Sequence, residues 1–193
     1  MVGRDLRVLF VCEGNLCRSP LAEQLLRARM SGYPVIVSSA GLAAMDGLPM
    51  PEEAAELCRR YGGNPEGHRS RLLTEAHLRE ADLVLTATRA QRGSAVQMMP
   101  RASRRTFTIH EFGRLLSFMS DEERRHDGEP QDLVERVRSI RGLAPPPENH
   151  EQDDLQDPYK RSNEIYELVG SQLDSDIRLI SQKILSGWTG RRP

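Results

Sequence analysis

Cysteine is scarce in this chain, whose 193 residues contain only Cys12, Cys17 and Cys58. An odd number without regular spacing argues against the disulfide framework of a small secreted protein. Zinc is also disfavoured, because Cys12 and Cys17 have no second pair of cysteine or histidine residues at ligand spacing elsewhere. We therefore expect a reduced, cytoplasmic protein that uses no metal and no other cofactor.

An excess of charge of one sign is absent as well. The chain has 27 lysine and arginine residues against 28 aspartate and glutamate residues, for a formal net charge of −1 at pH 7. Such a chain lacks the long-range attraction that draws general nucleic-acid and membrane-surface binders to their partners. We expect neither of these partners.

Long apolar runs are missing too. The N-terminal MVGRDLRVLFVC is too short for a signal-peptide core, and no segment reaches the length of a membrane span. Over residues 1–110, short apolar runs instead alternate with helical patterns, which is typical of strand–helix units around a parallel sheet. The sequence therefore predicts one α/β domain over residues 1–193, without membrane insertion.

The same patterns place the elements. Strands are predicted at 6–11, 34–38, 82–87 and 105–109. Ser19 and Pro20 are predicted as the N-cap and first position of a helix that runs to about residue 30, and a second helix begins near Pro51. Cys58 is interpreted as core, on the inner face of that second helix. A last helix, at about 162–185, carries an apolar stripe that we also interpret as core: Ile165, Leu168, Val169, Leu173, Ile177, Ile180 and Ile184.

Residues 119–154 differ from the rest in composition. The charged stretches SDEERRHDGEPQD and PPPENHEQDD flank a short predicted helix, DLVERVRSI. With so few apolar residues, the segment is predicted to be a surface insertion that adds little to the core.

The stretch VCEGNLCRSP, residues 11–20, carries the chemistry. Cys12 follows the predicted strand and opens the loop before a helix, where the helix dipole and converging backbone N–H groups stabilise a thiolate and bind phosphate. Arg18 follows six positions later, so its guanidinium can return to clamp two phosphate oxygens. Gly14 permits a tight backbone, and Asn15 tolerates a left-handed conformation. The pattern predicts a cysteine nucleophile that attacks phosphorus.

At these residues the sequence resembles the low-molecular-weight protein tyrosine phosphatases of bacterial type, whose loop reads V-C-x-G-N-x-C-R-S-P. Further motifs follow in the family's order: SSAG at 38–41, GHRSR at 67–71, AD at 81–82 and DPY at 157–159. The resemblance implies a flavodoxin-like fold, a parallel sheet in the order 2-1-3-4 flanked by helices. Cys12 would then lie near the switch point at which such sheets bind ligands.

The resemblance also implies a role for each matching residue. Cys12 would attack phosphotyrosine and become phosphocysteine, while Arg18 and the loop amides hold the oxygens and Ser19 assists the sulfur. Asp157 would protonate the leaving phenolate and later activate water. The implied substrate contacts are Glu13, Gly14, Asn15, Leu16, Cys17 and Tyr159. The implied loop supports are Asn15, Ser39 and His68.

Several alternatives stay open on the sequence. Cys17 is either a thiol that resolves oxidised Cys12 or a small packing residue. Arsenate reductases share this fold and loop but need a further thiol, and Cys58 is a poor candidate for it. A phosphate-binding module without catalysis would lose the nucleophile or the acid. The implied partner is a phosphotyrosine protein, and resemblance to bacterial members suggests a tyrosine kinase of exopolysaccharide synthesis as one candidate.

Overall fold

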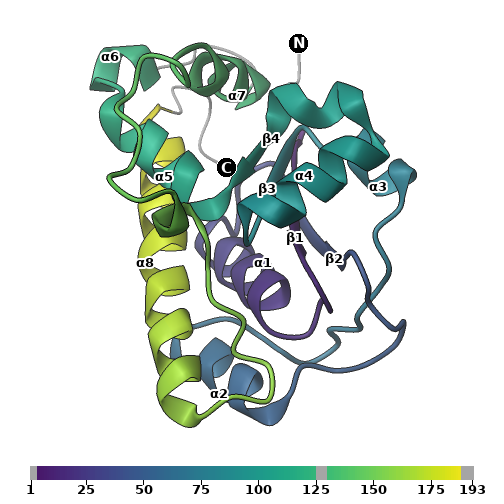
Figure 1. The fold of residues 1–193 in the computed structure, drawn as a ribbon. Coiled ribbons are helices and arrows are strands. Elements are labelled where there is room, and N and C mark those ends of the chain that lie inside the picture. Colours follow the sequence, from purple (N-terminus) through teal and green to yellow (C-terminus); the bar gives the residue numbers. More distant parts are fainter. Residues whose placement is uncertain (1–3, 125–129, 188–193) are drawn as a thin grey trace.

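The computed structural model describes residues 4–124 and 130–187 and has a four-stranded parallel sheet at its centre (Figure 1). The strands are β1 Leu6–Cys12, β2 Val35–Gly41, β3 Leu83–Thr86 and β4 Thr106–Thr108. Their order is β2-β1-β3-β4, which confirms the predicted topology. The order reverses direction at β1, so the crevice at its carboxyl end, where Cys12 lies, is the expected ligand site.

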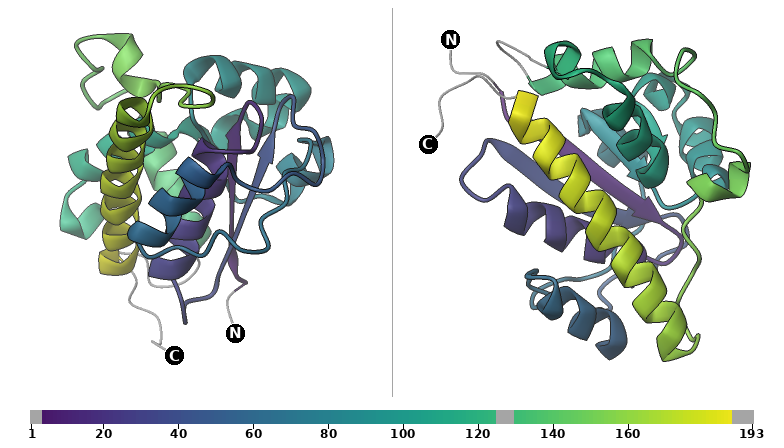
Figure 2. Two further views of the ribbon diagram at one scale, coloured as in Figure 1. Left: turned by 90° about the horizontal axis from the view of Figure 1, so that it is seen from below. Right: turned by 90° about the vertical axis from the view of Figure 1, so that its left-hand side faces the viewer.

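Alternate side chains of β1 enter two separate cores, because successive residues of a strand point to opposite faces. Val8 and Phe10 join the larger core, whereas Leu9 and Val11 join the smaller one. The larger core is covered by α1 Arg18–Arg29, α2 Glu52–Arg60, α5 Ile109–Phe118 and α8 Asn163–Gly187. The smaller one lies under α3 Glu75–Glu80 and α4 Arg89–Met98. Figure 2 shows α8 lying along α1, on one side of the sheet.

Two predicted boundaries near the motif were wrong. The first helix begins at Arg18 with Cys17 as its N-cap, so Ser19 and Pro20 lie inside the first turn. Proline is tolerated there because the first-turn N–H groups have no partner within the helix. Strand β2 continues to Gly41, because Gly41 pairs with Cys12 on one side and forms a bridge with Leu72 on the other.

The prediction for α8 is confirmed except at Leu168. Val169, Leu173 and Ile177 are at most 2% exposed, but Leu168 is 47% exposed. The apolar stripe of this helix is therefore narrower than the spacing suggests. Cys58 is fully buried in the larger core, as predicted. In the described part of the chain, no helix is both long and apolar enough to cross a membrane.

The prediction that residues 119–154 add little to the core was wrong. The segment forms α6 Asp121–Arg124, α7 Pro130–Ser139 and a short 3-10 turn, η2 His150–Asp153. Leu143 is 73% exposed, but six other apolar side chains of the segment are buried in the larger core: Met119, Leu133, Val134, Val137, Ile140 and Ala144. Arg141 stacks 4.1 Å from the centre of the Phe107 ring and bonds Glu111, which fastens the end of α7 to the domain.

We expect Val137→Ala to destabilise the whole domain. Val137 is fully buried in the larger core, so deleting two methyl groups should lower the free energy of unfolding by about 2 kcal/mol. Chemical denaturation measures the change. Asp132→Ala, at an exposed position of the same helix, is the matched control and should stay within about 0.5 kcal/mol of the parent. Equal stability of Val137→Ala and the parent would contradict the packing of α7.

Candidate active site

The nucleophile loop joins the end of β1 to the start of α1 and runs from Cys12 to Arg18. Asn15 is the loop residue with a positive φ, 52°, which confirms the predicted left-handed conformation. Gly14 has no such φ, and a Cβ there would meet only the Leu16 side chain at 3.7 Å. The predicted conformational need for glycine at position 14 was therefore wrong.

Behind the loop, a chain of hydrogen bonds leads to the Cys12 sulfur. Cys12 Sγ lies 2.9 Å from Ser19 Oγ. The Asn15 amide donates to both Ser19 Oγ and Ser39 Oγ, at 2.9 and 2.8 Å. Ser39 in turn donates to the Glu23 carboxylate at 2.5 Å. Because Ser19 Oγ already accepts from Asn15, its own proton is the one available to a Cys12 thiolate, and its other acceptor, the Ala40 carbonyl, is farther away at 3.5 Å.

The left-handed turn at Asn15 is held from two further sides. The Arg71 N–H donates to Asn15 Oδ1, and His68 Nε2 donates to the Asn15 carbonyl, both at 2.9 Å. Burial lowers the pKa of His68, so the neutral ring serves as a donor near pH 7. Asn15 itself is fully buried, so its side chain faces this network and not the substrate side of the loop. Ser39 and His68 lie beside it, where the resemblance places the loop supports.

Arg18 is buried, and its guanidinium is held by residues 155–157 of the connection before α8, which we call the acid loop. Its Nη1 donates to the Leu155 carbonyl at 3.0 Å, and its Nη2 lies 2.6 Å from Asp157 Oδ2. The Arg18 side chain is only 4% exposed, and its Nε has no hydrogen-bond partner among the described residues. A buried donor without a partner is costly. This donor is suited to an anion bound beside Cys12.

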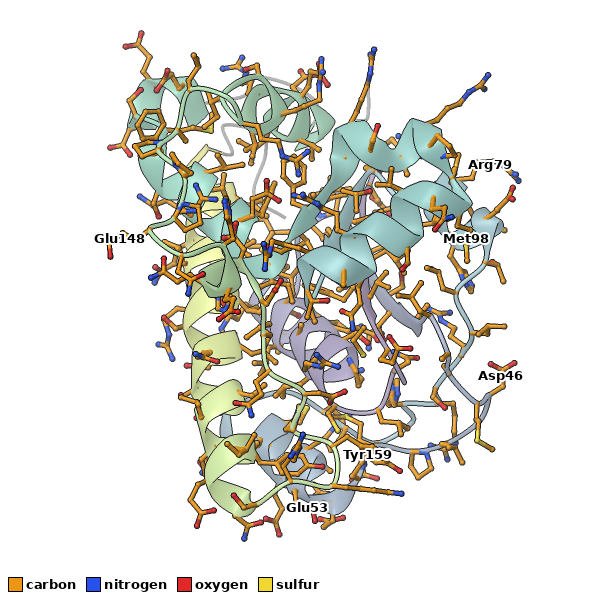
Figure 3. The ribbon with its side chains drawn as sticks, in the orientation of Figure 1. Asp46, Glu53, Arg79, Met98, Glu148 and Tyr159 are labelled. Carbon is orange, nitrogen blue, oxygen red and sulfur yellow. The ribbon has the colours of Figure 1, made fainter. Side chains whose placement is uncertain are left out.

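A cavity of about 280 Å³ opens over the loop. Cys12, Arg18 and Asp157 line it together, although Asp157 is distant from the other two in sequence. The remaining lining residues are Glu13, Gly14, Leu16, Cys17, Ala43, Met45, Leu48 and Tyr159. Tyr159 lies on the connection before α8, at the same end of the molecule as Glu53 of α2 (Figure 3). The cavity therefore combines apolar walls with a charged floor, which suits an aromatic phosphate ester.

Cys17 lies on the inner side of the loop and is 5% exposed. Its sulfur is 3.7 Å from the Tyr166 hydroxyl of α8. Burial raises the pKa of Cys17 to about 12, so the group is a thiol at neutral pH. The side chain packs between the loop and α8 as well as lining the cavity.

Sequence reasoning missed four residues that shape the site. These are Glu23, Gly41, Arg71 and Leu155, which touch the loop or its network. Gly41 and Arg71 lie within the SSAG and GHRSR motifs, so the sequence marked these positions but did not reveal their contacts with the nucleophile loop. Leu155 acts through its carbonyl, which leaves no side-chain signal in a sequence.

We expect Gly41→Ala to damage the loop. A Cβ at Gly41 would lie 2.5 Å from the Glu13 carbonyl oxygen and 2.7 Å from the Asn15 nitrogen, and such overpacking against backbone should cost about 3 kcal/mol of unfolding free energy or more. Gly14→Ala is the matched control, because its Cβ meets ordinary contacts, and it should stay within about 1 kcal/mol. Thermal unfolding of both variants tests the difference. Equal stabilities would contradict the close approach of β2 to the loop.

The comparisons with known proteins agree with this geometry. The model of the family described as low molecular weight phosphotyrosine protein phosphatase matches residues 7–132, more than half of the chain. The chain is 35% identical over 115 residues to a probable low molecular weight protein-tyrosine-phosphatase, EpsP of Ralstonia solanacearum; the alignment covers 60% of this chain and 76% of that protein. It is also 37% identical over 106 residues to a protein-arginine-phosphatase of Geobacillus stearothermophilus, covering 55% of this chain and 70% of that one.

A solved structure extends the likeness over nearly the full length. The low molecular weight protein tyrosine phosphatase from T. tengcongensis superposes with a TM-score of 0.68 at 30% identity, covering 93% of this chain and 99% of that one. The family match itself ends before Asp157, so the position of this residue beside Arg18 comes from the structure. By its matched residues, its sheet and its loop, the chain belongs to the low molecular weight phosphotyrosine protein phosphatase family.

Proposed function

We propose that this phosphatase hydrolyses phosphotyrosine in proteins through a phosphocysteine intermediate. The observation that carries the proposal is the convergence of Cys12, Arg18 and Asp157 on one cavity. Each of the three supplies one requirement of phosphoryl transfer: a nucleophile, charge neutralisation and a proton for the leaving oxygen. No metal ion is needed for any of these steps.

In the first step, the Cys12 thiolate attacks phosphorus and the bond from phosphorus to the phenolic oxygen breaks. Arg18 and the loop amides hold the non-bridging oxygens, and Asp157 gives its proton to the leaving phenolate. A bound dianion competes with Asp157 for Arg18, whose Nη2 lies 2.6 Å from that carboxylate without substrate. Binding therefore frees the Asp157 carboxyl to face the leaving oxygen.

In the second step, Asp157 accepts a proton from water as the water attacks the phosphocysteine. The sulfur–phosphorus bond breaks, which releases inorganic phosphate and restores the Cys12 thiolate. Ser19, 2.9 Å from the sulfur, stabilises that thiolate with a hydrogen bond and makes it a better leaving group.

A second candidate substrate is phosphoarginine, because one relative is named a protein-arginine-phosphatase. Apolar side chains at Leu16, Met45 and Leu48 line the cavity, and they favour a phenyl ring over a charged guanidinium. The discriminating experiment compares two peptides of one sequence that carry phosphotyrosine or phosphoarginine. We expect kcat/KM to be at least about tenfold higher for the phosphotyrosine peptide. A higher kcat/KM for the phosphoarginine peptide would identify phosphoarginine as the substrate instead.

Assays on the same enzyme preparation distinguish this proposal from two alternatives, an arsenate reductase and a module that binds phosphate without turnover. The proposal expects turnover of the phosphotyrosine peptide and no thiol-dependent reduction of arsenate. Reduction of arsenate without peptide turnover would establish the reductase, and phosphate binding with neither reaction would establish a binding module.

We also propose that the partner is a phosphotyrosine protein of the cytoplasm, with a bacterial tyrosine kinase as one candidate. The support is the likeness to bacterial relatives and the three free cysteines, which suit a reducing compartment. A pull-down from the native cell with Asp157→Ala, which should slow release of the substrate's phenolate, tests it. Recovery of no phosphotyrosine protein above an Arg18→Ala, Asp157→Ala control, which lacks the phosphate clamp, would count against this partner class.

Oxidation provides a test of Cys17. Peroxide converts the Cys12 thiolate to sulfenic acid. Cys17 can attack that sulfur once its own thiol has lost its proton, and the proton leaves with the sulfenic hydroxyl as water when the disulfide forms. We expect the treated parent to regain several-fold more activity with dithiothreitol than Cys17→Ser, in which Cys12 oxidises further. Cys58→Ser, which removes a buried thiol elsewhere, should recover like the parent. Equal recovery of parent and Cys17→Ser would leave Cys17 as a packing residue alone.

A further inference from the structure

The chain just before Asp157 is fixed to the domain by two ion pairs that no part of the proposed reaction uses. Asp154 Oδ1 accepts the backbone N–H of Arg89 at 2.6 Å, and the Arg89 guanidinium lies 2.9 Å from Asp154 Oδ2. Arg89 is the first residue of α4. Asp154 therefore binds both the free N–H of a helix start and the side chain beside it.

The second pair joins the preceding residue to another helix. Arg114 of α5 lies 3.2 Å from Asp153 Oδ2 and also donates to the Pro145 carbonyl at 2.8 Å. Asp153 is 8% exposed, so water competes little for its carboxylate. We call these two pairs, Asp154 with Arg89 and Asp153 with Arg114, the acid-loop clasp.

The clasp is connected to the cavity through Leu155. The Leu155 side chain is 1% exposed, and its N–H donates to the Ala87 carbonyl at 2.8 Å, directly after β3. Its carbonyl accepts from Arg18 at 3.0 Å. Two residues further on, Asp157 reaches Arg18 with half of its own side chain exposed. Asp157 therefore extends from an anchored stretch and has few contacts of its own.

The long connection from α7 needs such an anchor. It passes Glu148 and descends to the end of the molecule at which α8 begins (Figures 1 and 3). Asp157 lies between η2 and α8 in turns without regular structure. Loops of this kind are mobile unless side chains tie them down.

We propose that the acid-loop clasp positions Asp157 for proton transfer, which makes Arg89, Arg114, Asp153 and Asp154 positioning residues. The proposal rests on the proposed function, because it assigns Asp157 as the acid. Helices α4 and α5 follow β3 and β4, whose carboxyl ends lie at the same edge of the parallel sheet as the end of β1. The clasp therefore ties the acid to the edge of the sheet that bears the nucleophile loop.

The pair of Asp154 with Arg89 stays charged at working pH. Burial acts to raise the pKa of Asp154, but the hydrogen bonds and charge of Arg89 outweigh it and hold that pKa below its usual value. Glu151, which lies nearby and contributes to the potential at Arg89, is also acidic. Neutral pH therefore keeps the pair charged, so its ion pair and hydrogen bonds are present under assay conditions.

The test uses leaving groups of different acidity. A misplaced acid should slow the transfer of phosphate from phenyl phosphate, whose phenolate needs a proton, more than from dinitrophenyl phosphate, whose leaving group does not. For Asp154→Ala we expect kcat/KM to fall about tenfold on phenyl phosphate and by less than about twofold on dinitrophenyl phosphate. Arg89→Met retains the hydrogen bond from the residue 89 backbone N–H to Asp154, so its kcat/KM on phenyl phosphate should fall only about threefold, half of the tenfold effect on a logarithmic scale.

Controls separate the clasp from the fold and from the acid itself. Glu151→Gln removes an exposed carboxylate from the same turn and should match the parent on both esters. Arg89→Lys should restore part of the loss seen in Arg89→Met. Equal loss on both esters in a folded Asp154→Ala, or no loss on either, would overturn the clasp. If Asp157→Ala itself slows all leaving groups equally, Asp157 is not the general acid. The proposed function is then wrong at this residue, and the positioning role of the clasp is refuted with it.

Discussion

Replacing Cys12 by serine is expected to abolish the hydrolysis of aryl phosphates while inorganic phosphate still binds. A serine hydroxyl remains protonated where a cysteine forms a thiolate, so the nucleophile is lost. We expect kcat/KM for a nitrophenyl ester to fall at least about 10⁴-fold, the scale on which the removal of a catalytic nucleophile acts. The anion site should survive, because Arg18 and the loop backbone do not depend on the Cys12 sulfur.

Steady-state kinetics and phosphate titration by calorimetry measure the two halves of this prediction. Cys58→Ser is the matched control, since Cys58 is buried on α2 and does not line the cavity. Its turnover should stay near that of the parent. Retained hydrolysis in Cys12→Ser would refute the covalent mechanism. Loss of phosphate binding together with loss of fold would call for Cys12→Ala as the second variant.

Removing the acid is expected to give the second largest effect, and one that depends on the substrate. Without the Asp157 carboxyl, a phenolate of high basicity leaves unprotonated, so kcat/KM for phenyl phosphate should fall about 10²- to 10⁴-fold in Asp157→Ala. Dinitrophenyl phosphate, whose leaving oxygen needs no proton, should lose less than about tenfold in kcat/KM. Its kcat should still fall, because hydrolysis of phosphocysteine also uses Asp157.

A series of aryl phosphates of graded leaving-group acidity measures this dependence as a slope. Glu148→Ala removes an exposed carboxylate from the same connection and should leave the slope unchanged. Phosphate should bind Asp157→Ala at least as tightly as the parent, because Asp157 no longer competes for Arg18. Equal slowing along the whole series would mean that Asp157 supports Arg18 rather than donating a proton.

Local patterns in the sequence were enough to predict the four strands and the nucleophile loop. The strand, loop and helix around Cys12 are contiguous, and short-range rules govern each of them: alternation in β1, a left-handed residue at Asn15, and proline in a first turn. The sheet order came from resemblance to a family whose motifs occur in order along the chain. The structure confirmed it.

The same rules failed where burial depends on distant partners. Residues 119–154 have few apolar side chains, yet four of them repeat at helical spacing along α7 and the residue after it, and all four are buried: Leu133, Val134, Val137 and Ile140. Composition averages over a segment, whereas burial depends on one face. The opposite error occurred at Leu168. Helical spacing predicted it to be in the core, but the face of α8 that packs against the domain is too narrow to include it, and its side chain is exposed.

What the sequence by itself determined is therefore the chemistry available: a cysteine at a strand end, an arginine six residues later, and an aspartate in a DPY motif. Only the tertiary structure decided how these groups meet. It brought Asp157 to 2.6 Å from Arg18, placed the Gly41 backbone against the loop, and tied the acid loop to α4 and α5 through Asp154 and Asp153. The physical reason is that such contacts join residues far apart along the chain, and their geometry is set by the packing of the whole domain.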